Sequence, residues 1–395
     1  MVALVALAAA VGQAFGRFSY GILLPAVRDD LDITNTIAGL IGATNMGAYL
    51  FGTLLVAWAT GHFRLATVLR FGLVLTTAGL GFASLATSPL TLSFALLITG
   101  LGGACLWIPA PAIAASALPE RYRGLAVGLM GSGIGLGVVL VSVISGALRA
   151  SKGDAAWSEI YGIQFAVGLV LLISVLAFVR HQQSTPMGGA GIGGFNALRR
   201  MPGWQPLILA YATFGFMYLL VLGFLTSRLE DDSGWLTQSA ATAFTLTGTA
   251  MIFGGPIFTT LASRLGLRLT LATAFSLWPV LVFAVLSGDV LIVYGACIGL
   301  GLLFSALPTL ITLYVVTHTS TANYGPSFAA ATLIFGLAQT LSPATGGLIA
   351  DLTGSFFVVF FWLASWAWWV FLRLCGYLKI RAEGRDSARV PKTFG

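Results

Sequence analysis

Long apolar segments separated by short polar breaks run through the whole 395-residue chain. Each segment holds about 20 residues or more, which is enough for a helix to cross roughly 30 Å of hydrocarbon. Inside a bilayer the backbone must satisfy its own hydrogen bonds, so the segments are predicted to be α-helices. Runs such as LVLTTAGLGFASLA lack the alternation of transmembrane β-strands. The pattern therefore predicts a polytopic all-α membrane protein.

Twelve such segments can be counted, six on each side of a polar stretch near the middle of the chain. The first six are expected at about 3–27, 35–60, 67–87, 90–116, 125–148 and 160–179. The second six are expected at about 205–227, 238–262, 270–287, 290–316, 326–350 and 355–378. We therefore expect an N-terminal six-helix bundle at 1–179, a linker at 180–204, a C-terminal six-helix bundle at 205–378 and a tail at 379–395.

The two stretches that could be assigned otherwise are the N-terminus and the linker. The start, MVALVALAAAVGQAFG, lacks the basic region of a signal peptide, and its apolar run continues to Val27. It is therefore predicted to be the first membrane helix. The linker, HQQSTPMGGAGIGGFNALRRMPGWQ, is rich in Gly, Gln, Ser and Pro, which is typical of a loop between domains.

Composition and charge support the membrane assignment and predict the orientation of the helices. The chain is 57% hydrophobic and 8% charged, whereas soluble domains carry about 25% charged residues. If both ends face the cytoplasm, 15 of the 20 Lys and Arg residues lie on the inner side and four on the outer side. This is the positive-inside distribution, so we expect a bacterial cytoplasmic (inner) membrane protein with both termini cytoplasmic. The net charge of +7 then reflects topology, and nucleic acid is not an expected partner.

An internal repeat relates the two halves. The segment GLGGACLWIP at 100–109 matches GLGLLFSALP at 299–308, which places Pro109 opposite Pro308 at an offset of 199. Phe15 and Gly16 correspond at the same offset to Phe214 and Gly215. Two separate matches at one offset indicate duplication, in which helix 4 pairs with helix 10 and helix 1 with helix 7.

Duplicated six-helix halves joined by a cytoplasmic linker resemble the major facilitator superfamily, whose members bind solute near the bilayer midplane between the halves. LASRLGLR at 261–268, LPERYRGLAVG at 118–128, GLMGSGIGLG at 128–137 and SPATGGLIADLTGS at 342–355 resemble local signatures of that family. Ser263 replaces the Asp of one signature, its first copy AWATGHFR is degenerate, and the helix 5 signature lacks its Gly-Pro pair. The stretches GRFSYGILLPAVRDDL and FGGPIFTTLASRLG resemble the YbfB/YjiJ-type branch.

Arg17 is the one basic residue left inside the membrane by this topology. It precedes Val27 by ten residues, so it lies about 15 Å below the outer surface, close to the middle of the bilayer. A central Arg costs roughly 2.5–3.5 kcal/mol on insertion scales, and all thirteen acids fall in loops, tails or helix ends. A guanidinium suits bidentate recognition of carboxylate or phosphate, so Arg17 is predicted to bind an anionic group in a central cavity.

Two other roles for Arg17 stay open from the sequence. Its guanidinium could donate to carbonyls of a broken neighbouring helix, or order a polar gate without touching the solute. Phe216 occupies the equivalent position in helix 7, so a symmetric pair of arginines is not expected.

Further solute-binding candidates are polar residues at membrane depth. Gln13 and Tyr20 share a helical face with Arg17. The other candidates are the deeper residues Asn45, Trp107, Tyr218 and Gln339. Tyr49, Tyr211 and Tyr314 are also polar but are not predicted to bind the solute. The alternative is that Asn45 and Gln339 only bond neighbouring helices, and that the Tyr and Trp residues anchor at the membrane interface.

Gating candidates follow from helix breakers and from the resemblance. Pro109 and Pro308 are predicted to bend helices 4 and 10, because a proline frees a backbone carbonyl. Arg264 and Arg268 stand in LASRLGLR, which resembles the signature of the family's inner gate.

No catalytic or metal-binding pattern is recognised. The three cysteines are far apart in apolar segments, at Cys105, Cys297 and Cys375. The three histidines fall at helix ends or in loops, at His62, His181 and His318. The membrane helices offer no acid or base for catalysis, so we expect neither an enzyme nor a bound cofactor or metal. Proton coupling would then have to use acids at outer helix ends or a weak-acid solute beside Arg17.

Together these patterns predict a secondary transporter that moves a small organic solute, more consistent with an anion, by alternating access. One alternative is a multidrug and proton antiporter that exports amphipathic compounds, suggested by the glycine-rich helix 5. Another is a non-transporting membrane receptor, although the longest soluble pieces are only the linker and the tail. The expected partners are a small molecule, with or without a coupling proton, and the lipid bilayer, and we expect a monomer.

Overall fold

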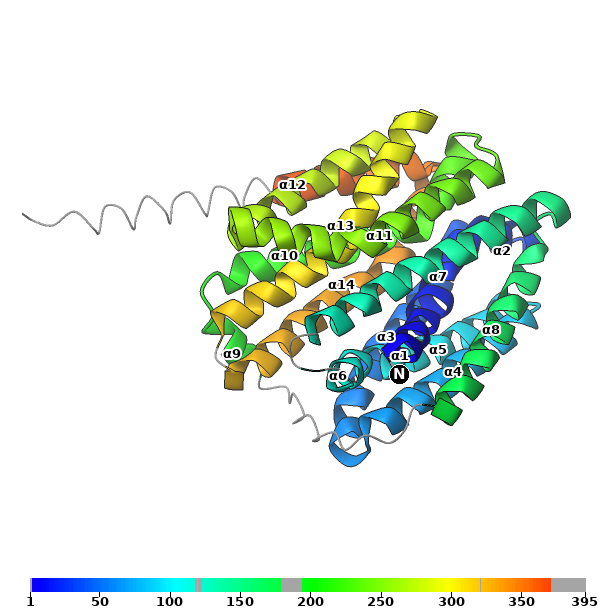
Figure 1. The fold of residues 1–395 in the computed structure, drawn as a ribbon. Coiled ribbons are helices and arrows are strands. Elements are labelled where there is room, and N and C mark those ends of the chain that lie inside the picture. The colour runs from blue at the N-terminus through cyan, green and yellow to red at the C-terminus, as the bar shows by residue number, and fades with distance from the viewer. Residues whose placement is uncertain (1, 118, 120–122, 179–193, 320, 371–395) are drawn as a thin grey trace, which may run out of the picture.

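The computed structural model describes residues 2–117, 119, 123–178, 194–319 and 321–370, with the side chains at 61, 115, 123–129, 194 and 321–326 left out. Every regular element in these ranges is helical (Figure 1). Eleven helical stretches are long and apolar enough to cross a membrane, and a shorter apolar helix follows at Phe356–Val370. The predicted all-α membrane fold is confirmed.

The N-terminal half contributes six membrane helices. The first is made of three consecutive segments, α1 (Val2–Ala10), η1 (Val11–Phe18) and α2 (Ser19–Asp30). The others are α3 (Asn35–His62), α4 (Leu65–Ser84), α5 (Pro89–Trp107) with α6 (Ala110–Ser116), α7 (Arg123–Lys152) and α8 (Ala156–Phe178).

The C-terminal half repeats this arrangement after a short helix in the predicted linker, α9 (Gly194–Arg199). Its helices are α10 (Trp204–Ser227) with η3 (Arg228–Asp232), α11 (Thr237–Leu265), α12 (Leu267–Val285), α13 (Val290–His318), α14 (Thr321–Thr353) and the helix at Phe356–Val370. Residues 180–193 of the predicted linker, the end of the last predicted helix and the tail at 379–395 lie outside the described residues. The predicted domain boundaries therefore stay predictions.

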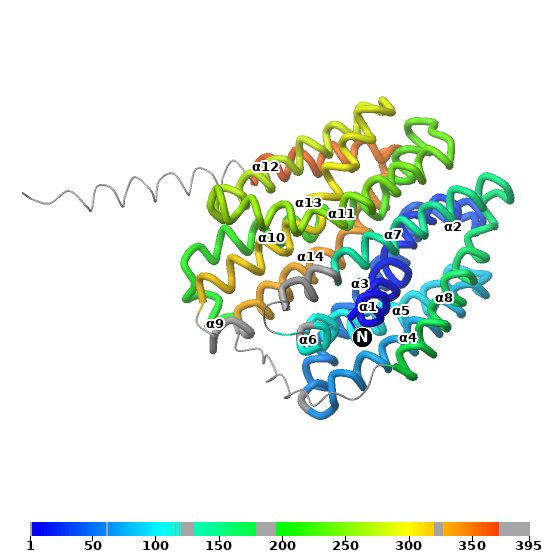
Figure 2. Tube along the Cα trace, viewed as in Figure 1, coloured from blue at the N-terminus to red at the C-terminus, as the bar shows by residue number. Residues whose placement is uncertain are grey.

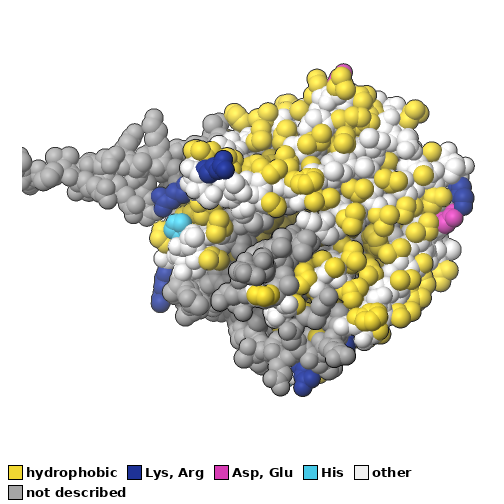
Figure 3. Space-filling model, viewed as in Figure 1, with side chains coloured by type: hydrophobic (Ala, Val, Ile, Leu, Met, Phe, Trp, Pro, Cys, Tyr) yellow, Lys and Arg dark blue, Asp and Glu magenta, His cyan; other side chains and the backbone are white. Residues whose placement is uncertain are grey.

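The turns define two ends of the helix bundle. The linker end carries α9 and the turns at 63–64 and 266, and the acidic end carries the turns at 31–34, 85–88, 153–155, 233–236, 286–289 and 354–355. Side chains cap helices α5 and α13 where they start at the acidic end, since Ser88 accepts from the Thr91 backbone N–H and Asp289 from the Leu291 backbone N–H. Figure 3 shows apolar side chains over the visible flank and charged side chains gathered toward its ends.

The two halves meet through three helix pairs, in which α2 packs on α10, α3 on α14, and α7 on α11. Figure 1 shows the last pair, with α7 beside α11. Glycines allow this close approach. A Cβ added to Gly21 would lie 2.3 Å from the Leu222 carbonyl oxygen, one on Gly39 would lie 2.3 Å from that of Pro343, and one on Gly135 would lie 2.5 Å from that of Gly248. Small residues at helix contacts are typical of membrane proteins.

Burial separates the first helix from the helices that face lipid. In its most apolar stretch 78% of the residues of Val2–Asp30 are buried, against 28% for α8. The dark-blue trace in Figure 2 accordingly runs between other helices. Large apolar side chains such as Val170 and Phe178 of α8 are exposed, as expected for a surface that contacts hydrocarbon. Polar groups on the first helix are therefore enclosed by protein.

The duplicated helices 4 and 10 keep one contact and differ in another. Gly100 approaches the Asn45 carbonyl oxygen of α3, and Gly301 approaches the Thr247 carbonyl oxygen of α11, so the repeat preserves glycine packing in both halves. Pro109 falls in the break between α5 and α6, whereas Pro308 lies inside the continuous helix α13. The interruption at Pro109 agrees with the predicted effect of proline on helix 4. At Pro308, by contrast, helix α13 continues without interruption.

Candidate functional site between the two halves

Arg17 lies on a π-helical segment in the middle of the first membrane helix. Residues Val11–Phe18 form this segment, and the backbone N–H of Ser19 donates to the Ala14 carbonyl five residues earlier. Gly12 and Gly16 allow neighbouring helices to approach it, because a Cβ on Gly12 would lie 2.9 Å from the Leu106 side chain. π-helical turns are rare and occur frequently at functional sites.

The guanidinium of Arg17 is buried and has neutral hydrogen-bond acceptors. Its Nη1 donates to Gln13 Oε1 at 3.1 Å and its Nε contacts Met46 Sδ at 3.1 Å. Its Nη2 donates to Gln339 Oε1 of α14, which belongs to the other half. Only 8% of Arg17 is exposed, and no carboxylate contacts it in the described part of the chain. Its positive charge is thus held by amide and thioether groups.

Aromatic rings surround the same guanidinium. Its carbon lies 4.7 Å from the ring centre of Tyr49, 5.4 Å from that of Phe18 and 5.8 Å from that of Tyr218. Such contacts stabilise a cation by about 0.5–2 kcal/mol each, depending on how far it is desolvated. They compensate part of the cost of burial and leave the formal charge unbalanced.

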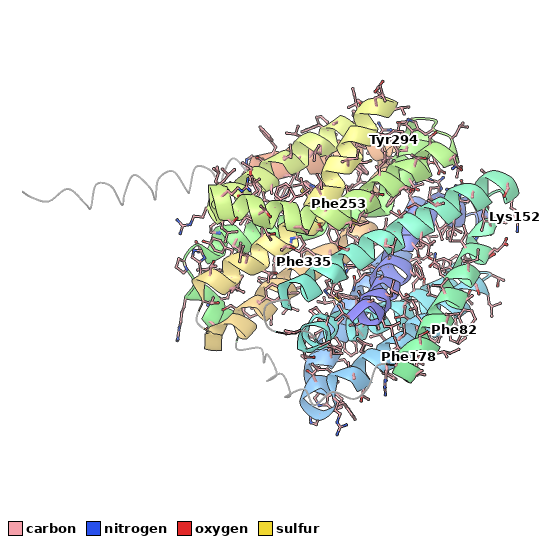
Figure 4. The ribbon with its side chains drawn as sticks, in the orientation of Figure 1. Phe82, Lys152, Phe178, Phe253, Tyr294 and Phe335 are labelled. Atoms are coloured by element: carbon pink, nitrogen blue, oxygen red, sulfur yellow. The ribbon has the colours of Figure 1, made fainter. Side chains whose placement is uncertain are left out.

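A cluster of nearly parallel rings adjoins Arg17 on the side of the C-terminal half. Tyr218 stacks on Phe214 at 5.3 Å and on Phe335 at 5.7 Å, and Phe335 also stacks on Tyr211 at 4.5 Å. Phe335 and Gln339 lie one turn apart on α14, and Figure 4 marks Phe335 on that helix. The rings therefore form an apolar wall next to the charged group.

A small cavity of about 30 Å³ lies between the halves, with room for a few water molecules. Four helices line it: the first membrane helix with Arg17 and Tyr20, α3 with Asn45 and Met46, α10 with Leu219 and Leu222, and α14 with Pro343. An organic solute does not fit in this volume. Solute binding therefore requires the halves to separate around Arg17.

Tyr20 and Asn45 line this cavity, but their hydrogen bonds are made to neighbouring helices. The Tyr20 hydroxyl donates to the Ala38 carbonyl at 2.8 Å. Asn45 Nδ2 donates to the carbonyls of Gly16 and Leu96 at 3.0 and 2.7 Å and to Thr99 Oγ1 at 2.9 Å. Asn45 thereby joins three helices at the level of the π-helical segment, which matches the interhelical alternative considered for it.

The remaining predicted residues lie apart from Arg17. Trp107 ends α5 and packs against apolar core residues, and it is not among the residues that contact Arg17 or line the cavity. Arg264 and Arg268 are exposed on either side of the turn at Gly266, at the linker end. Pro109 and Pro308 lie on α5–α6 and α13, outside the set of residues that line the cavity. The solute and gating roles of all these residues stay predictions.

Met46, Tyr49 and Phe335 are among the residues at the site that the sequence does not predict as solute-binding. Met46 contacts Arg17 directly, and its apolar side chain gives no sequence signal. Tyr49 was noted as polar, and its spacing of four from Asn45 could have placed it on the same face. Phe335 lies four residues before Gln339, so the same spacing rule applies to it.

The acidic end is closed by charged contacts between the halves. Arg28 forms an ion pair with Asp231, and Arg149 donates to both oxygens of Glu230 at 2.9 and 2.8 Å. Asp351 of α14 accepts from the backbone N–H groups of Asn35 and Thr36, at the start of α3, at 3.0 and 2.7 Å. Together with the glycine contacts, these bonds separate the Arg17 cavity from the acidic end.

Comparisons with known proteins agree with this geometry. The chain is 23% identical over 353 residues to the cis,cis-muconate transport protein of Acinetobacter baylyi, across 83% of this chain and 82% of that protein. It is 26% identical over 180 residues to a probable 4-methylmuconolactone transporter of Cupriavidus pinatubonensis, across 44% and 40% of the two chains. A solved POT family transporter in complex with 5-aminolevulinic acid has the same fold, with a TM-score of 0.77, 13% identity and coverage of 94% and 95%.

The family model for the Major Facilitator Superfamily matches residues 6–343. That match spans most of the chain and both halves, including Arg17, Tyr218 and Gln339. The narrower YbfB/YjiJ-type assignment stays a prediction. The relatives are transporters and their fold is a transporter fold, so catalysis is not the activity of this molecule. The protein belongs to the major facilitator superfamily and is a multi-pass membrane transporter.

Proposed function

We propose that the protein transports a small organic anion by alternating access and that Arg17 binds the anionic group. The coarser activity, secondary transport of a small organic solute, follows from the family. The observation that carries the anion is the buried guanidinium of Arg17, whose hydrogen-bond partners among the described residues are neutral. A central Arg costs roughly 2.5–3.5 kcal/mol, and an anionic ligand offsets that cost.

The hydrogen-bond geometry supports a carboxylate. Nη1 and Nη2 of Arg17 already donate to two side-chain oxygens, those of Gln13 and Gln339. A carboxylate offers two oxygens to the same pair of nitrogens in a bidentate arrangement. It can therefore replace the two amide oxygens and also balance the buried positive charge, which the amides cannot do.

The apolar wall beside Arg17 supports a carboxylate with a flat, unsaturated body. Tyr211, Phe214, Tyr218 and Phe335 present stacked rings next to the guanidinium. Ring faces favour offset stacking with other π-systems. Muconate, which one relative is named for transporting, is an unsaturated dicarboxylate of this kind.

Access in this conformation is proposed to be from the linker end. The acidic end is closed by Arg28–Asp231, by Arg149–Glu230 and by glycine contacts. We propose that the linker end faces the cytoplasm of a bacterial inner membrane, as the distribution of basic residues predicts. A monomer is the proposed working unit, and the use of a coupling proton can be tested by imposing a pH gradient.

A thermal-unfolding screen of the purified protein tests the anion assignment. We expect cis,cis-muconate and benzoate to raise the melting temperature, because a ligand at 100 times its dissociation constant adds about 2.7 kcal/mol of stability. Arg17→Gln should remove this stabilisation, and Arg200→Gln, which removes an exposed charge at the linker end, should preserve it. Equal stabilisation of Arg17→Gln by the carboxylates would contradict the proposal.

The same screen separates the rival functions. Stabilisation by tetraphenylphosphonium and not by carboxylates would indicate an exporter of amphipathic cations. Carboxylate binding without uptake into proteoliposomes would indicate a receptor.

A further inference from the structure

The side-chain oxygen of Gln339 occupies the position where an oxygen of a bound solute anion would accept hydrogen bonds. Its Oε1 accepts a hydrogen bond from Arg17 Nη2 of the N-terminal half and another from the Tyr218 hydroxyl of the C-terminal half at 3.4 Å. Only 1% of Gln339 is exposed, so water does not compete for this oxygen. One acceptor atom thus lies where a cationic donor and a neutral donor from opposite halves converge.

We propose that Gln339 is an internal substitute for the solute anion, which satisfies Arg17 in the empty transporter and is displaced when solute binds. The proposal rests on the function proposed above for Arg17. An amide oxygen is an uncharged acceptor with geometry close to that of one carboxylate oxygen. A bound carboxylate would take both donors, Arg17 and Tyr218, and free the side chain of Gln339.

The substitution has a consequence for the transport cycle. The Arg17–Gln339 bond joins the first helix to α14 and therefore joins the two halves. Net transport requires the empty carrier to pass through a state in which the halves close around Arg17 without solute. A buried Arg17 without a hydrogen-bond acceptor would raise the free energy of this closed, empty state. The hydrogen bond to Gln339 lowers the free energy of the same state. The protein is therefore inferred to carry out net transport of its anion and not only obligatory exchange.

Replacement of Gln339 by Leu tests this role, because Leu has a side chain of similar size but no hydrogen-bond acceptor. A hydrogen bond to a charged group contributes about 1.5–3 kcal/mol, which corresponds to about tenfold or more in an equilibrium. In proteoliposomes we expect Gln339→Leu to lower net uptake of labelled cis,cis-muconate about tenfold, while exchange against internal muconate stays within twofold. The dissociation constant for muconate should fall about tenfold, since the competitor is gone.

Gln164 provides a matched control. It is 2% exposed, lies on α8 within the N-terminal half and is not among the residues that line the Arg17 cavity. Gln164→Leu should change the ratio of net uptake to exchange by less than twofold.

Gln339→Glu gives a second test with the opposite sign, which remains informative if Gln339→Leu does not fold. The introduced carboxylate would pair permanently with Arg17, so muconate binding should be lost while the melting temperature of the empty protein rises. Unchanged muconate affinity in Gln339→Glu would overturn the proposal.

The outcomes separate this inference from the function on which it rests. If net uptake and exchange fall together in Gln339→Leu, or if neither changes, Gln339 is only a packing residue and the inference fails. The anion function of Arg17 then stands or falls separately, on whether Arg17→Gln loses carboxylate binding.

Discussion

Arginines of the N-terminal half reach the C-terminal half at two levels of the molecule, and their partners differ in kind. At the acidic end, Arg28 pairs with Asp231 and Arg149 pairs with Glu230. In the middle of the membrane, Arg17 reaches two neutral groups, the amide oxygen of Gln339 and the ring of Tyr218. The first two charges are balanced by carboxylates, whereas the third has no carboxylate partner in the part of the chain that the structure describes. Arginine side chains therefore join the halves at the acidic end, whereas the arginine in the middle of the membrane remains able to bind an anion.

Burial makes the difference energetically important. The side chain of Arg149 is 3% exposed and that of Glu230 is 12% exposed, whereas Lys152 and Glu159, which also pair, are 54% and 47% exposed. Figure 4 marks Lys152 at the acidic end. Removal of one partner of a buried pair typically costs 3–5 kcal/mol, while an exposed pair contributes about 0–1 kcal/mol. Closure of the acidic end thus depends on Arg149 and Glu230 more than on the surface pair.

The largest expected effect comes from Arg17→Ala at the middle level. Uptake of cis,cis-muconate into proteoliposomes should fall at least about 100-fold, because two hydrogen bonds from a charged group are lost. The protein should remain folded, since the substitution removes an unbalanced buried charge. Size-exclusion chromatography and the initial uptake rate are the two measurements.

Arg200→Ala is the matched control for this prediction. Arg200 is exposed at the linker end and has no predicted role in binding or gating, so its removal should leave uptake within about twofold. Undiminished uptake by Arg17→Ala would show that Arg17 does not bind the solute. The unbalanced charge in the middle of the membrane would then have no role in transport.

The next effect is expected for Arg149→Met at the acidic end. It leaves Glu230 without its cation. Because 12% of the Glu230 side chain remains exposed to water, the free energy of unfolding should fall by about 2 kcal/mol, less than for a fully buried pair. The double variant Arg149→Met, Glu230→Met should recover at least half of this loss, because no unpaired carboxylate remains at that position. Chemical denaturation in detergent gives these values. Lys152→Met is the control, and an equal loss there would mean that burial does not distinguish the two pairs.

Local sequence rules predicted the helices because apolar length and capping determine them. Helix 10, for example, was expected at about 290–316 and is observed at Val290–His318, directly after the capping residue Asp289. The π-helical segment Val11–Phe18 was not predicted, because its wider turn accompanies close packing of Gly12 against α5 and not a local preference. For the same reason Pro109 and Pro308 have different surroundings although they correspond in the repeat.

The candidate site was predictable only as far as local rules reach. Arg17 is recognised as a lone charge in an apolar run, and Gln13 follows from its spacing of four. The contact of Arg17 with Gln339 spans 322 positions and depends on how the halves pack, so the sequence identified Gln339 as polar without its partner. Met46 has no polar group that could have marked it.

A smaller effect is expected for Arg17→Lys, which keeps the charge and loses the planar pair of donors. Lysine is a compact charge and cannot make two parallel hydrogen bonds to one carboxylate. The dissociation constant for muconate should rise about tenfold, well short of the loss in Arg17→Ala. Isothermal titration calorimetry measures it, and wild-type affinity in Arg17→Lys would show that charge alone is recognised at the middle level.

The smallest effect is expected for Gly21→Ala, which acts on closure without changing any charge. The added methyl group would lie 2.3 Å from the Leu222 carbonyl oxygen of the other half, so the closed acidic end should lose about 1 kcal/mol. A cysteine replacing Leu24 in the cavity, in a chain without Cys105, Cys297 and Cys375, should then react about fivefold faster with an impermeant maleimide added at the acidic side.

Gly223→Ala is the control at the same helix contact, because a Cβ there meets nothing within 4 Å. If the two variants react equally fast, backbone contact between α2 and α10 does not hold the acidic end closed. Closure would then depend mainly on the ion pairs of Arg28 and Arg149 and on the hydrogen bonds of Asp351. The main physical difference between the two levels would be that carboxylates balance the arginines at the acidic end, whereas Arg17 has only neutral partners among the described residues.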